Sequence, residues 1–351
     1  HSYVTHQSGE VIQRLGAAEG CRYVSDHAKL DCKCKVKFAI IPSRPMQNGE
    51  RSLLHYMEAG PQILQEVAEY LGIWIDEGIK AKAIIRPKNT EELSKVLAIC
   101  NDNKQPVVPH GGLTGLAEGA ITQAGQIAIS TERLNEIENI DTVGRTITLG
   151  AGVPLEKAQN AAEENNLMLA VDLGARGSCT IGGNISTNAG GNMVVKYGMT
   201  RDSVLGLEAV LADGRIVTSL NEMLKNNSGY DLKQLFIGTE GTLGFVTRAV
   251  LRLREQPKSI NTALWAVNSF DQVTKFLKHI DKGLGGNLSA FEVMWEDFYK
   301  QVTTEPALNS PPLTQGFPYY VLVETTGSNQ TKDSEHFEEL LEEALNLEII
   351  E

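Results

Sequence analysis

Residues 172–191 read DLGARGSCTIGGNISTNAGG, and the frequency of glycine sets this stretch apart. Helices and strands both lose stability when glycine is this frequent in their interiors. We therefore expect irregular backbone that lies against a long, extended ligand, with a set of unrelated turns as the alternative. The chain has 33 glycines, and 21 of them fall between Pro109 and Gly244. We therefore expect similar irregular backbone on both sides of residues 172–191.

A second glycine-rich segment, PHGGLTGL at 109–116, follows a short apolar stretch. Gly111 and Gly112 are adjacent and Gly115 lies three residues further on, which leaves several backbone N–H groups free to converge. Such a nest binds anions, typically phosphate, and Thr114 can add a hydroxyl donor. A tight turn that holds no ligand is the alternative interpretation.

Two further segments complete the glycine-rich region. KYGMTRDSVLGLEAVLADGRIV at 196–217 is typical of a strand, a turn and a second strand, and GYDLKQLFIGTEGTLGFVTRAVLRL at 229–253 spaces its glycines as GxxGxxG. That spacing differs from the GxGxxG of dinucleotide-binding Rossmann folds. The sequence also lacks a phosphate-binding GxxxxGK[ST] loop and a GxSxG nucleophile elbow. A nicotinamide-dependent dehydrogenase is therefore unsupported.

Composition limits the class of protein. The 351 residues carry a net charge of −12, which argues against nucleic-acid binding, and no apolar run is long enough to span a bilayer. The five cysteines are odd in number and none has CxxC spacing, so we expect free thiols in a reducing compartment and predict no metal site. The first residues lack the apolar core of a signal peptide.

Periodicity predicts an alternation of strands and helices. Asn89 and Glu92 predict a capped helix that ends near Asn103, and Pro154 predicts a helix that ends near Asn166. Other predicted helices cover 60–72, 270–280 and 334–346, and predicted strands cover 38–42, 83–86, 106–109, 126–130, 146–149, 207–211, 216–218, 246–253, 262–267, 289–293 and 319–324.

The amino-acid composition changes after Pro257, where glycine becomes rarer, so we place a domain boundary near residue 256. The order of strands and helices beyond it favours a small α+β domain with an antiparallel sheet. His279 falls on a polar helix face and His336 on an acidic helix, and we expect solvent around both.

At these motifs the chain resembles the flavoproteins of the PCMH type, also called the vanillyl-alcohol-oxidase type. Within them it is similar to the branch of D-2-hydroxyglutarate dehydrogenase and FAD-linked D-lactate dehydrogenase, also grouped as FAD-linked oxidases. The resemblance runs from about Ile84 to Gly327 through IIRPKNTEEL, PHGGLTGL, DLGARGSCTIGGNISTNAGG, GLEAVLADG, GYDLKQLFIGTEGTLG, LSAFEVM and YVLVETTGSN.

The resemblance implies an α+β fold in which two subdomains hold FAD, bound non-covalently, followed by a partial α/β cap (substrate) domain. It implies a poorly matched extension over 1–80, an FAD-binding domain over 81–256 and a cap domain over 257–351 that stops early. The loop histidine would contact cofactor or solvent without covalent attachment. The implied cofactor-binding residues are Arg86, Pro87, Pro109, His110, Gly111, Gly112, Leu113, Thr114, Gly115, Leu116, Leu173, Gly174, Gly177, Ser178, Gly182, Gly183, Asn188, Gly190, Gly191, Glu240, Gly241, Gly244 and Val246.

The implied activity is FAD-dependent oxidation of a D-2-hydroxy acid, D-2-hydroxyglutarate or D-lactate, to the 2-oxo acid. Electrons would pass to an electron-transfer flavoprotein, a quinone or a cytochrome, in the cytoplasm or the mitochondrial matrix, and a homodimer is compatible with this. Catalytic residues are unknown, because GGNLSAF at 285–291 has serine where the family's GDGNLH stretch has histidine. A divalent metal such as zinc is expected only in a longer form. The alternative is a non-catalytic FAD-binding fragment or pseudoenzyme.

Overall fold

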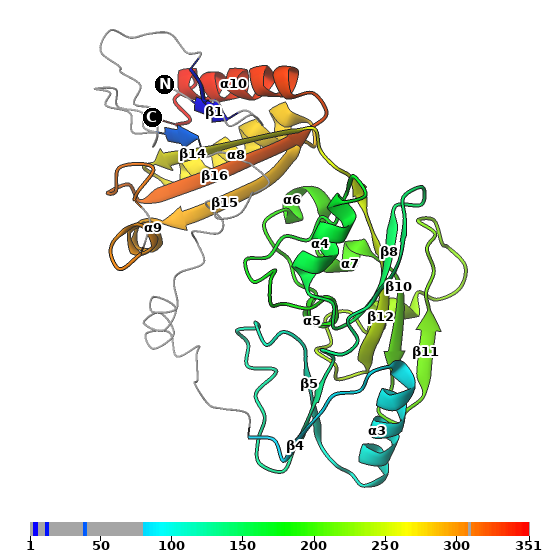
Figure 1. Cartoon of the computed structure of the whole chain (residues 1–351). Helices are drawn as coiled ribbons and strands as arrows, with labels where there is room; N and C mark the ends of the chain where they lie inside the picture. Colours follow the sequence, from blue (N-terminus) through cyan, green and yellow to red (C-terminus); the bar gives the residue numbers. More distant parts are fainter. Residues whose placement is uncertain (1–2, 6–10, 14–37, 41–79, 308–309, 351) are drawn as a thin grey trace. The chain divides into compact units, whose positions relative to one another are not determined.

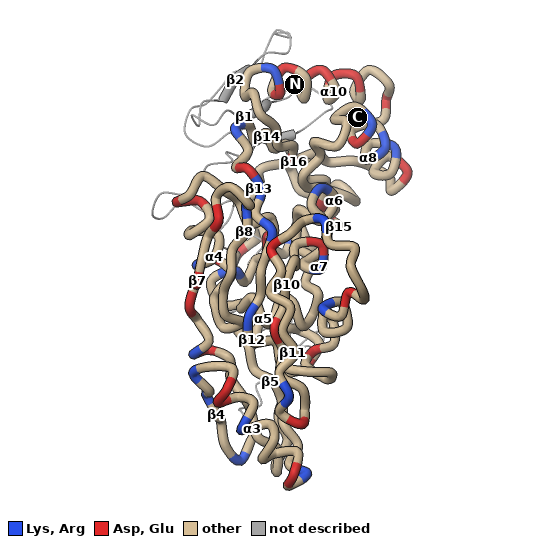
Figure 2. The backbone as a smooth tube through the Cα atoms, turned by 90° about the vertical axis from the view of Figure 1, so that its right-hand side faces the viewer, with Lys and Arg blue, Asp and Glu red and all other residues tan. Residues whose placement is uncertain are grey.

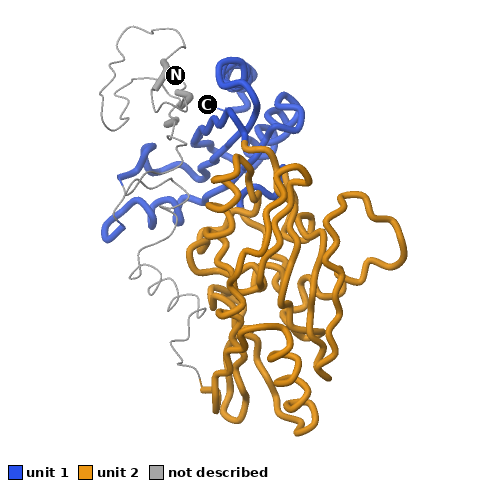
Figure 3. Tube along the Cα trace, turned by 45° about the vertical axis from the view of Figure 1, so that its right-hand side comes forward, with its two compact units in different colours: residues 1–67, 192–196, 257–351 blue, residues 68–191, 197–256 orange. Residues whose placement is uncertain are grey.

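The computed structural model describes residues 3–5, 11–13, 38–40, 80–307 and 310–350. The chain divides into two compact units (Figure 3). The central unit comprises Ala68–Gly191 and Tyr197–Gln256, and the C-terminal unit comprises His1–Val67, Asn192–Lys196 and Pro257–Glu351. The predicted helix over 60–72 lies outside the described residues.

The central unit begins with a small parallel sheet in the strand order β4-β6-β5 (Figure 1). Its connecting helix α3 buries Leu93, Leu97 and Cys100, which follow the helical period predicted from the sequence. The elements are β4 (Ala83–Ile85), α3 (Thr90–Asp102), β5 (Val107–His110) and β6 (Ile127–Ser130).

A larger antiparallel sheet in the order β11-β10-β12-β8-β7 forms the rest of the central unit. The turn predicted between the strands over 207–211 and 216–218 falls at Asp213-Gly214 and joins β10 to β11 as a hairpin, and Gly214 has φ of +87° there. The strands are β7 (Ile137–Asp141), β8 (Thr146–Gly150), β10 (Val204–Val210), β11 (Ile216–Ser219), β12 (Phe245–Arg252) and the short pair β9 (Leu167–Met168) and β13 (Arg254–Glu255).

Helices α4 (Leu155–Glu163) and α5 (Ile181–Thr187) cover part of this sheet (Figure 1), and their apolar side chains share one core with β8, β10 and β12. Helix α4 ends at Glu163, before the predicted Asn166, because Asn166 takes a left-handed conformation with φ of +58°. The other short elements are α7 (Thr200–Ser203) and the 3-10 turn η1 (Leu232–Leu235), whereas α6 (Val194–Tyr197) falls largely within Asn192–Lys196 of the C-terminal unit.

The expectation that residues 172–191 avoid regular structure is wrong at α5, which forms in the middle of the stretch. Thr180 caps the helix with its side chain, and Gly182 and Gly183 fall in the first turn. A Cβ on Gly182 would lie 2.6 Å from the Ala151 Cβ and 2.9 Å from the Ala151 carbonyl oxygen. Glycine is thus required here because the helix approaches the strand end closely, and the helix tolerates it at its start.

The C-terminal unit is a four-stranded antiparallel sheet in the order β15-β16-β14-β3, and helices α8 and α10 pack on one face (Figure 1). The elements are β3 (Phe38–Ile40), β14 (Ser259–Val267), α8 (Phe270–Leu284), β15 (Leu288–Trp295), α9 (Glu296–Thr303), β16 (Tyr319–Gly327) and α10 (Gln330–Asn346). A separate pair joins β1 (Tyr3–Thr5) to β2 (Val11–Gln13).

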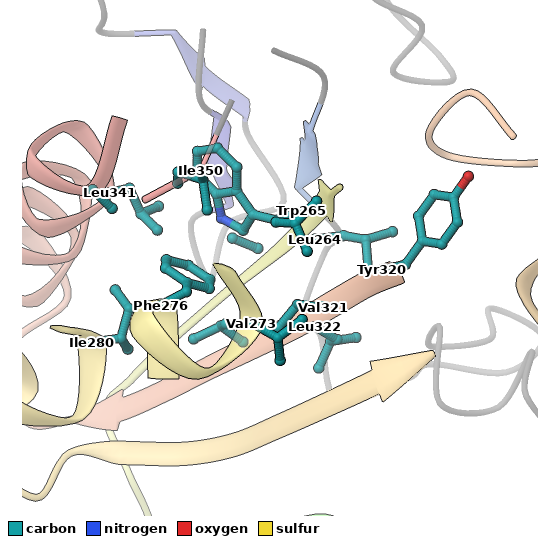
Figure 4. Packing of buried hydrophobic residues seen from close by; sticks show 14 of the residues in the cluster. Leu264, Trp265, Val273, Phe276, Ile280, Tyr320, Val321, Leu322, Leu341 and Ile350 are labelled. Atoms are coloured by element: carbon teal, nitrogen blue, oxygen red, sulfur yellow. The ribbon is translucent and has the colours of Figure 1, made fainter. Parts of the chain in front are cut away.

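Aliphatic side chains and a few aromatic rings fill the space between this sheet and its helices (Figure 4). Trp265 of β14 and Phe276 of α8 are fully buried and meet edge to face, with ring centroids 5.8 Å apart. Each such buried aromatic ring contributes several kcal/mol relative to alanine. On the other face, Tyr299 of α9 stacks on Tyr320 of β16 with ring centroids 3.6 Å apart.

The two helix histidines do not both face solvent as predicted. The His279 ring contacts the Leu340 carbonyl oxygen of α10 at 2.9 Å, and its side chain is only 15% exposed. His336 stays exposed but reaches the Gly283 carbonyl oxygen of α8 at 3.1 Å. Both therefore join α8 to α10, a pairing between helices that the sequence period does not reveal.

Acidic side chains recur along α10, as the charge-coloured tube of Figure 2 shows. A search of the described helices finds none with the length and apolarity needed to cross a bilayer.

Candidate functional site

A cavity of about 630 Å³ lies within the central unit. Three stretches form its wall: the loop after β5, the chain around α5, and the turn before β12. All three stretches carry glycines that stand out in the sequence, and the fold brings them together. The predicted residues that line it are Pro109, His110, Gly111, Gly112, Leu113, Thr114, Gly115, Leu116, Leu173, Gly174, Gly182, Gly183, Glu240, Gly241 and Val246.

In the loop after β5, the main hydrogen-bond donors are backbone N–H groups. From Gly111 to Ala117, no backbone N–H donates a hydrogen bond to any described residue. The N–H groups of Gly174 and Ala175, in the stretch that leads to α5, likewise donate no hydrogen bond to a described residue. The residues that carry these N–H groups are half-buried or exposed, so the groups are open to solvent or to a ligand. A row of unpaired donors beside a cavity therefore suits an anionic ligand.

Close backbone packing explains one of the loop glycines. A Cβ on Gly112 would lie 2.0 Å from the Ser178 carbonyl oxygen and 2.8 Å from the Cys179 Cα. Gly115 differs, because nothing lies within 4 Å of its Cβ position. The loop therefore packs closely against the backbone of Ser178 and Cys179 at Gly112, whereas the space at Gly115 is open.

His110 is the last residue of β5, directly before the loop, and is almost fully buried. Its Nε2 is 2.9 Å from the Ala120 carbonyl oxygen. A carbonyl only accepts hydrogen bonds, so Nε2 carries the proton in this contact. The contact closes the loop on itself, and this ring nitrogen is occupied by the protein.

Charged side chains are scarce on the wall. Among the residues that line the cavity there is no lysine or arginine, and Glu240 is the one carboxylate. Glu240 has a left-handed backbone with φ of +52°, held by its N–H donating to the Ser186 carbonyl oxygen at 2.8 Å. An anion in this cavity would thus be bound by backbone dipoles rather than by side-chain cations.

Cys179 also lines the cavity and was not among the predicted site residues. Burial raises the pKa of its thiol, and the side chain of Asn184 opposes that shift more weakly. The thiol is therefore protonated at neutral pH and unreactive. Further lining residues missed from the sequence are Ala117, Gly119, Ala120, Thr131, Ala175, Thr180, Asn184, Ser186, Thr187, Ala189 and Phe245.

Several predicted residues lie away from the cavity wall. Arg86 is exposed and pairs with Glu132 at 2.8 Å, whereas Asn188 caps α5 and accepts a hydrogen bond from the Arg201 N–H at 3.0 Å. Gly244 lines a neighbouring cavity of about 530 Å³ instead. The others that do not line the main cavity are Pro87, Gly177, Ser178, Gly190 and Gly191.

Metal ligands do not gather in the part of the chain that the structure describes. No group of three or more His, Cys, Asp and Glu side chains there is placed to hold a metal ion.

Comparison with known families now gives the class of protein. Residues 81–219 match the family described as FAD binding domain, and residues 256–351 match the C-terminal domain of FAD linked oxidases. The chain therefore belongs to the flavoproteins that join these two domains. These matches confirm the resemblance inferred from the glycine-rich motifs.

Two relatives show how similar the chain is to single members of the family. The chain is 40% identical over 267 residues to the mitochondrial D-2-hydroxyglutarate dehydrogenase of Danio rerio, covering 76% of this chain and 50% of the relative. It is 41% identical over 252 residues to a D-2-hydroxyglutarate dehydrogenase of Xanthomonas citri pv. viticola, covering 72% and 52%. The chain thus spans about half the length of the curated relatives it matches.

A solved structure of alkyldihydroxyacetonephosphate synthase shares the fold with a TM-score of 0.62. It is 15% identical and aligns with 82% of this chain and 60% of its own, so the likeness concerns the fold alone. Together with the strands and helices described above, it confirms the predicted α+β fold class.

Proposed function

We propose that this protein is an FAD-dependent D-2-hydroxyacid dehydrogenase and that FAD occupies the 630 Å³ cavity of the central unit. The substrate would be D-2-hydroxyglutarate or D-lactate, and the product the 2-oxo acid. The central unit would bind the cofactor, and the C-terminal unit would contribute to the substrate side.

The observation that carries the proposal is the row of unpaired backbone N–H groups from Gly111 to Ala117. A dinucleotide presents two adjacent phosphates, and free N–H groups bind such oxygens without needing a lysine or arginine. The cavity wall has neither cation, which matches this mode of binding. Its size is within the range of cofactor pockets, about 300–1,000 Å³.

When bound, FAD would accept a hydride from the carbon that bears the substrate hydroxyl. The roles that we propose for the residues of this chain are to bind the cofactor and to shape its site. Residues 111–117 would bind the diphosphate, His110 would fix the loop through its contact with Ala120, and the apolar side chains of Leu113 and Leu116 would shield the site from water.

Non-covalent attachment belongs to the same proposal. The His110 Nε2 donates to the Ala120 carbonyl oxygen at 2.9 Å, so one of the two ring nitrogens is already engaged. The Cys179 thiol is kept protonated by burial, which makes it a poor nucleophile toward a flavin ring.

Partners and compartment follow from the relatives. Dehydrogenases of this kind pass electrons on, and we propose an electron-transfer flavoprotein, a quinone or a cytochrome as acceptor. The mitochondrial name of the Danio rerio relative favours the mitochondrial matrix over the cytoplasm. A homodimer, and a divalent metal such as zinc held by a longer form of the chain, remain part of the proposal.

Flavin chemistry tests the proposal directly. The purified protein should show the absorption bands of oxidised flavin, and heat or acid should release FAD into the supernatant. Anaerobic addition of D-2-hydroxyglutarate or D-lactate should bleach the bands, whereas the L-enantiomers should not. Protein that binds no flavin after incubation with FAD would sink the proposal. Flavin that binds but is not bleached would favour the non-catalytic alternative.

A further inference from the structure

Arg201 of α7 joins two stretches of the central unit and does not itself line the 630 Å³ cavity. Its guanidinium group donates to the Ile237 carbonyl oxygen at 2.7 Å, and to the carbonyl and side-chain oxygens of Gln234 at 3.2 and 2.6 Å. Its backbone N–H donates to the Oδ1 of Asn188, the residue that caps the end of α5, at 3.0 Å. One residue thus ties the chain that leads to β12 to the end of α5.

The guanidinium group of Arg201 is half-buried and donates to neutral oxygens alone within the described chain. A guanidinium presents its donors in a rigid, planar fork, so it fixes the relative positions of the oxygens that accept from it. The three acceptors belong to residues 234 and 237, directly before the turn that lines the cavity. The contact of Arg201 therefore sets where that turn begins.

The turn of residues 238–241 has an unfavourable backbone. Gly238, Glu240 and Gly241 have φ of +81°, +52° and +80°. Left-handed backbone is uncommon for glutamate, and such conformations persist only where the surrounding structure holds them. The Gly238 N–H donates to the Ile185 carbonyl oxygen of α5 at 3.0 Å, which supports the turn next to the Glu240 contact with the same helix. The turn is thus held both by α5 and by the guanidinium group.

Two residues of this turn, Glu240 and Gly241, line the cavity. The Gly241 N–H donates no hydrogen bond to a described residue, and the Glu240 carboxylate is the one charged group among the lining residues. The turn therefore offers a ligand one donor and one acceptor. The positions of both groups depend on the backbone conformation that Arg201 helps to hold.

We propose that Arg201 is a positioning residue for the cofactor. By fixing the carbonyl groups of Gln234 and Ile237, it holds the turn so that the Glu240 carboxylate and the Gly241 N–H meet FAD in a preformed arrangement. A preformed wall loses less conformational freedom when the ligand binds, so Arg201 raises the affinity without touching FAD. The inference rests on the proposed function, since it needs FAD in the cavity.

The test compares three variants of the full chain. Arg201→Met removes the guanidinium group and keeps an unbranched side chain, whereas Arg201→Lys keeps the charge but loses the planar fork. Arg215→Met is the matched control, because Arg215 is exposed, pairs with Asp213 at 2.7 Å in the hairpin turn and does not line the cavity. Calorimetric titration of the flavin-free protein with FAD gives affinities, and visible circular dichroism reports the surroundings of the bound flavin. Hydrogen exchange of the empty protein reports the protection of residues 238–246.

We expect Arg201→Met to weaken FAD binding about tenfold, the effect of one hydrogen bond, and to change the circular dichroism of the bound flavin. Arg201→Lys should weaken binding less, and Arg215→Met should bind FAD as wild type does. In empty Arg201→Met, residues 238–246 should exchange faster, whereas α3 of the same unit should keep its exchange rates.

The outcomes separate this inference from the proposed function. If folded Arg201→Met binds FAD as tightly as wild type and with the same spectrum, the arginine serves the fold alone and the inference fails, while the proposed function stands. An equal loss of affinity in Arg215→Met, or faster exchange spread evenly over α3 and the turn, also contradicts it. Should Arg201→Met fail to fold, wild-type affinity in Arg201→Lys overturns the inference. If wild type binds no FAD, the proposed function fails and the inference fails with it.

Discussion

Gly112 and Gly115 share one loop, but the space around them differs. A Cβ on Gly112 would meet the Ser178 carbonyl oxygen at 2.0 Å, and that backbone has no flexible end to give way. We expect Gly112→Ala to lower the free energy of unfolding by about 2 kcal/mol, in the range of overpacked sites. Urea unfolding of the flavin-free protein followed by circular dichroism would measure it.

Gly115→Ala is the matched control, because nothing lies within 4 Å of that Cβ position. This variant should unfold as wild type does. If FAD occupies the open space, as proposed, the added methyl group should weaken FAD binding instead. Equal destabilisation by both alanines would contradict the account of the loop.

Glu292 on β15 is the carboxyl whose charge state should affect stability. It pairs in register with Leu322, on the sheet face opposite the one that holds Trp265, and its carboxyl group forms no hydrogen bond with a described residue. Burial raises its pKa in the folded protein. The folded state then holds its proton to higher pH than the unfolded state, so stability falls as pH rises through this interval.

Glu292→Gln removes that titration. We expect the variant to gain up to about 1 kcal/mol at pH 7, a small value because the site is only half buried, and nothing near pH 4. Glu342→Gln, at an exposed position of α10, changes the net charge equally and serves as control. A gain that is the same at both pH values would contradict a titrating carboxyl.

At the scale of elements, the start of α3 depends on one side chain. The Asn89 Oδ1 accepts from the Glu92 N–H at 2.8 Å, whereas the Glu92 carboxylate accepts from the Lys88 N–H at 2.9 Å. The predicted cap is thus present, but the reciprocal half of the capping box goes to Lys88. We expect Asn89→Ala to cost about 1 kcal/mol. Asn101→Ala, exposed in the same helix, should be neutral or slightly stabilising.

Thermal or urea unfolding monitored by circular dichroism compares the two variants. If Asn89→Ala unfolds with Asn101→Ala at the wild-type midpoint, the cap contributes nothing to the stability of the unit.

Sequence patterns predicted these elements where periodicity or capping is local. The hairpin at Asp213-Gly214 and the helix after Asn89 follow from neighbouring residues, and both formed as expected. Helix α5 could not be predicted, because Gly182 at its start is explained by the close approach of Ala151, about thirty residues earlier in the chain. Asn184 was missed as well, because its neighbours in the sequence do not show that it lines the cavity.

At the scale of the whole molecule, the glycine-rich loops belong to one compact unit and the hydrophobic core of Figure 4 belongs to the other. The segment Asn192–Lys196 directly follows the glycine-rich stretch in sequence yet clusters with the C-terminal unit. Within that unit, the Lys196 Nζ donates to the Thr326 carbonyl oxygen at 2.8 Å. No pattern in the sequence indicated this excursion, because it depends on contacts more than a hundred residues apart.

This division leads to a prediction about ligand-linked stability. A ligand stabilises the folded form that binds it, by about 2.7 kcal/mol at a hundred times its dissociation constant. Every residue that lines the 630 Å³ cavity lies in the central unit. FAD should therefore raise the temperature at which the central unit unfolds and leave the C-terminal unit unchanged.

Hydrogen exchange followed by mass spectrometry separates the two units. With FAD present, protection should increase in peptides from β5, α5 and β12, while peptides from α8 and α10 keep their exchange rates. Their rates serve as the internal control, because α8 and α10 pack on the hydrophobic core of the C-terminal unit. An equal increase of protection in both units would mean that they unfold together, and the cavity would then stabilise the whole chain rather than one unit of it.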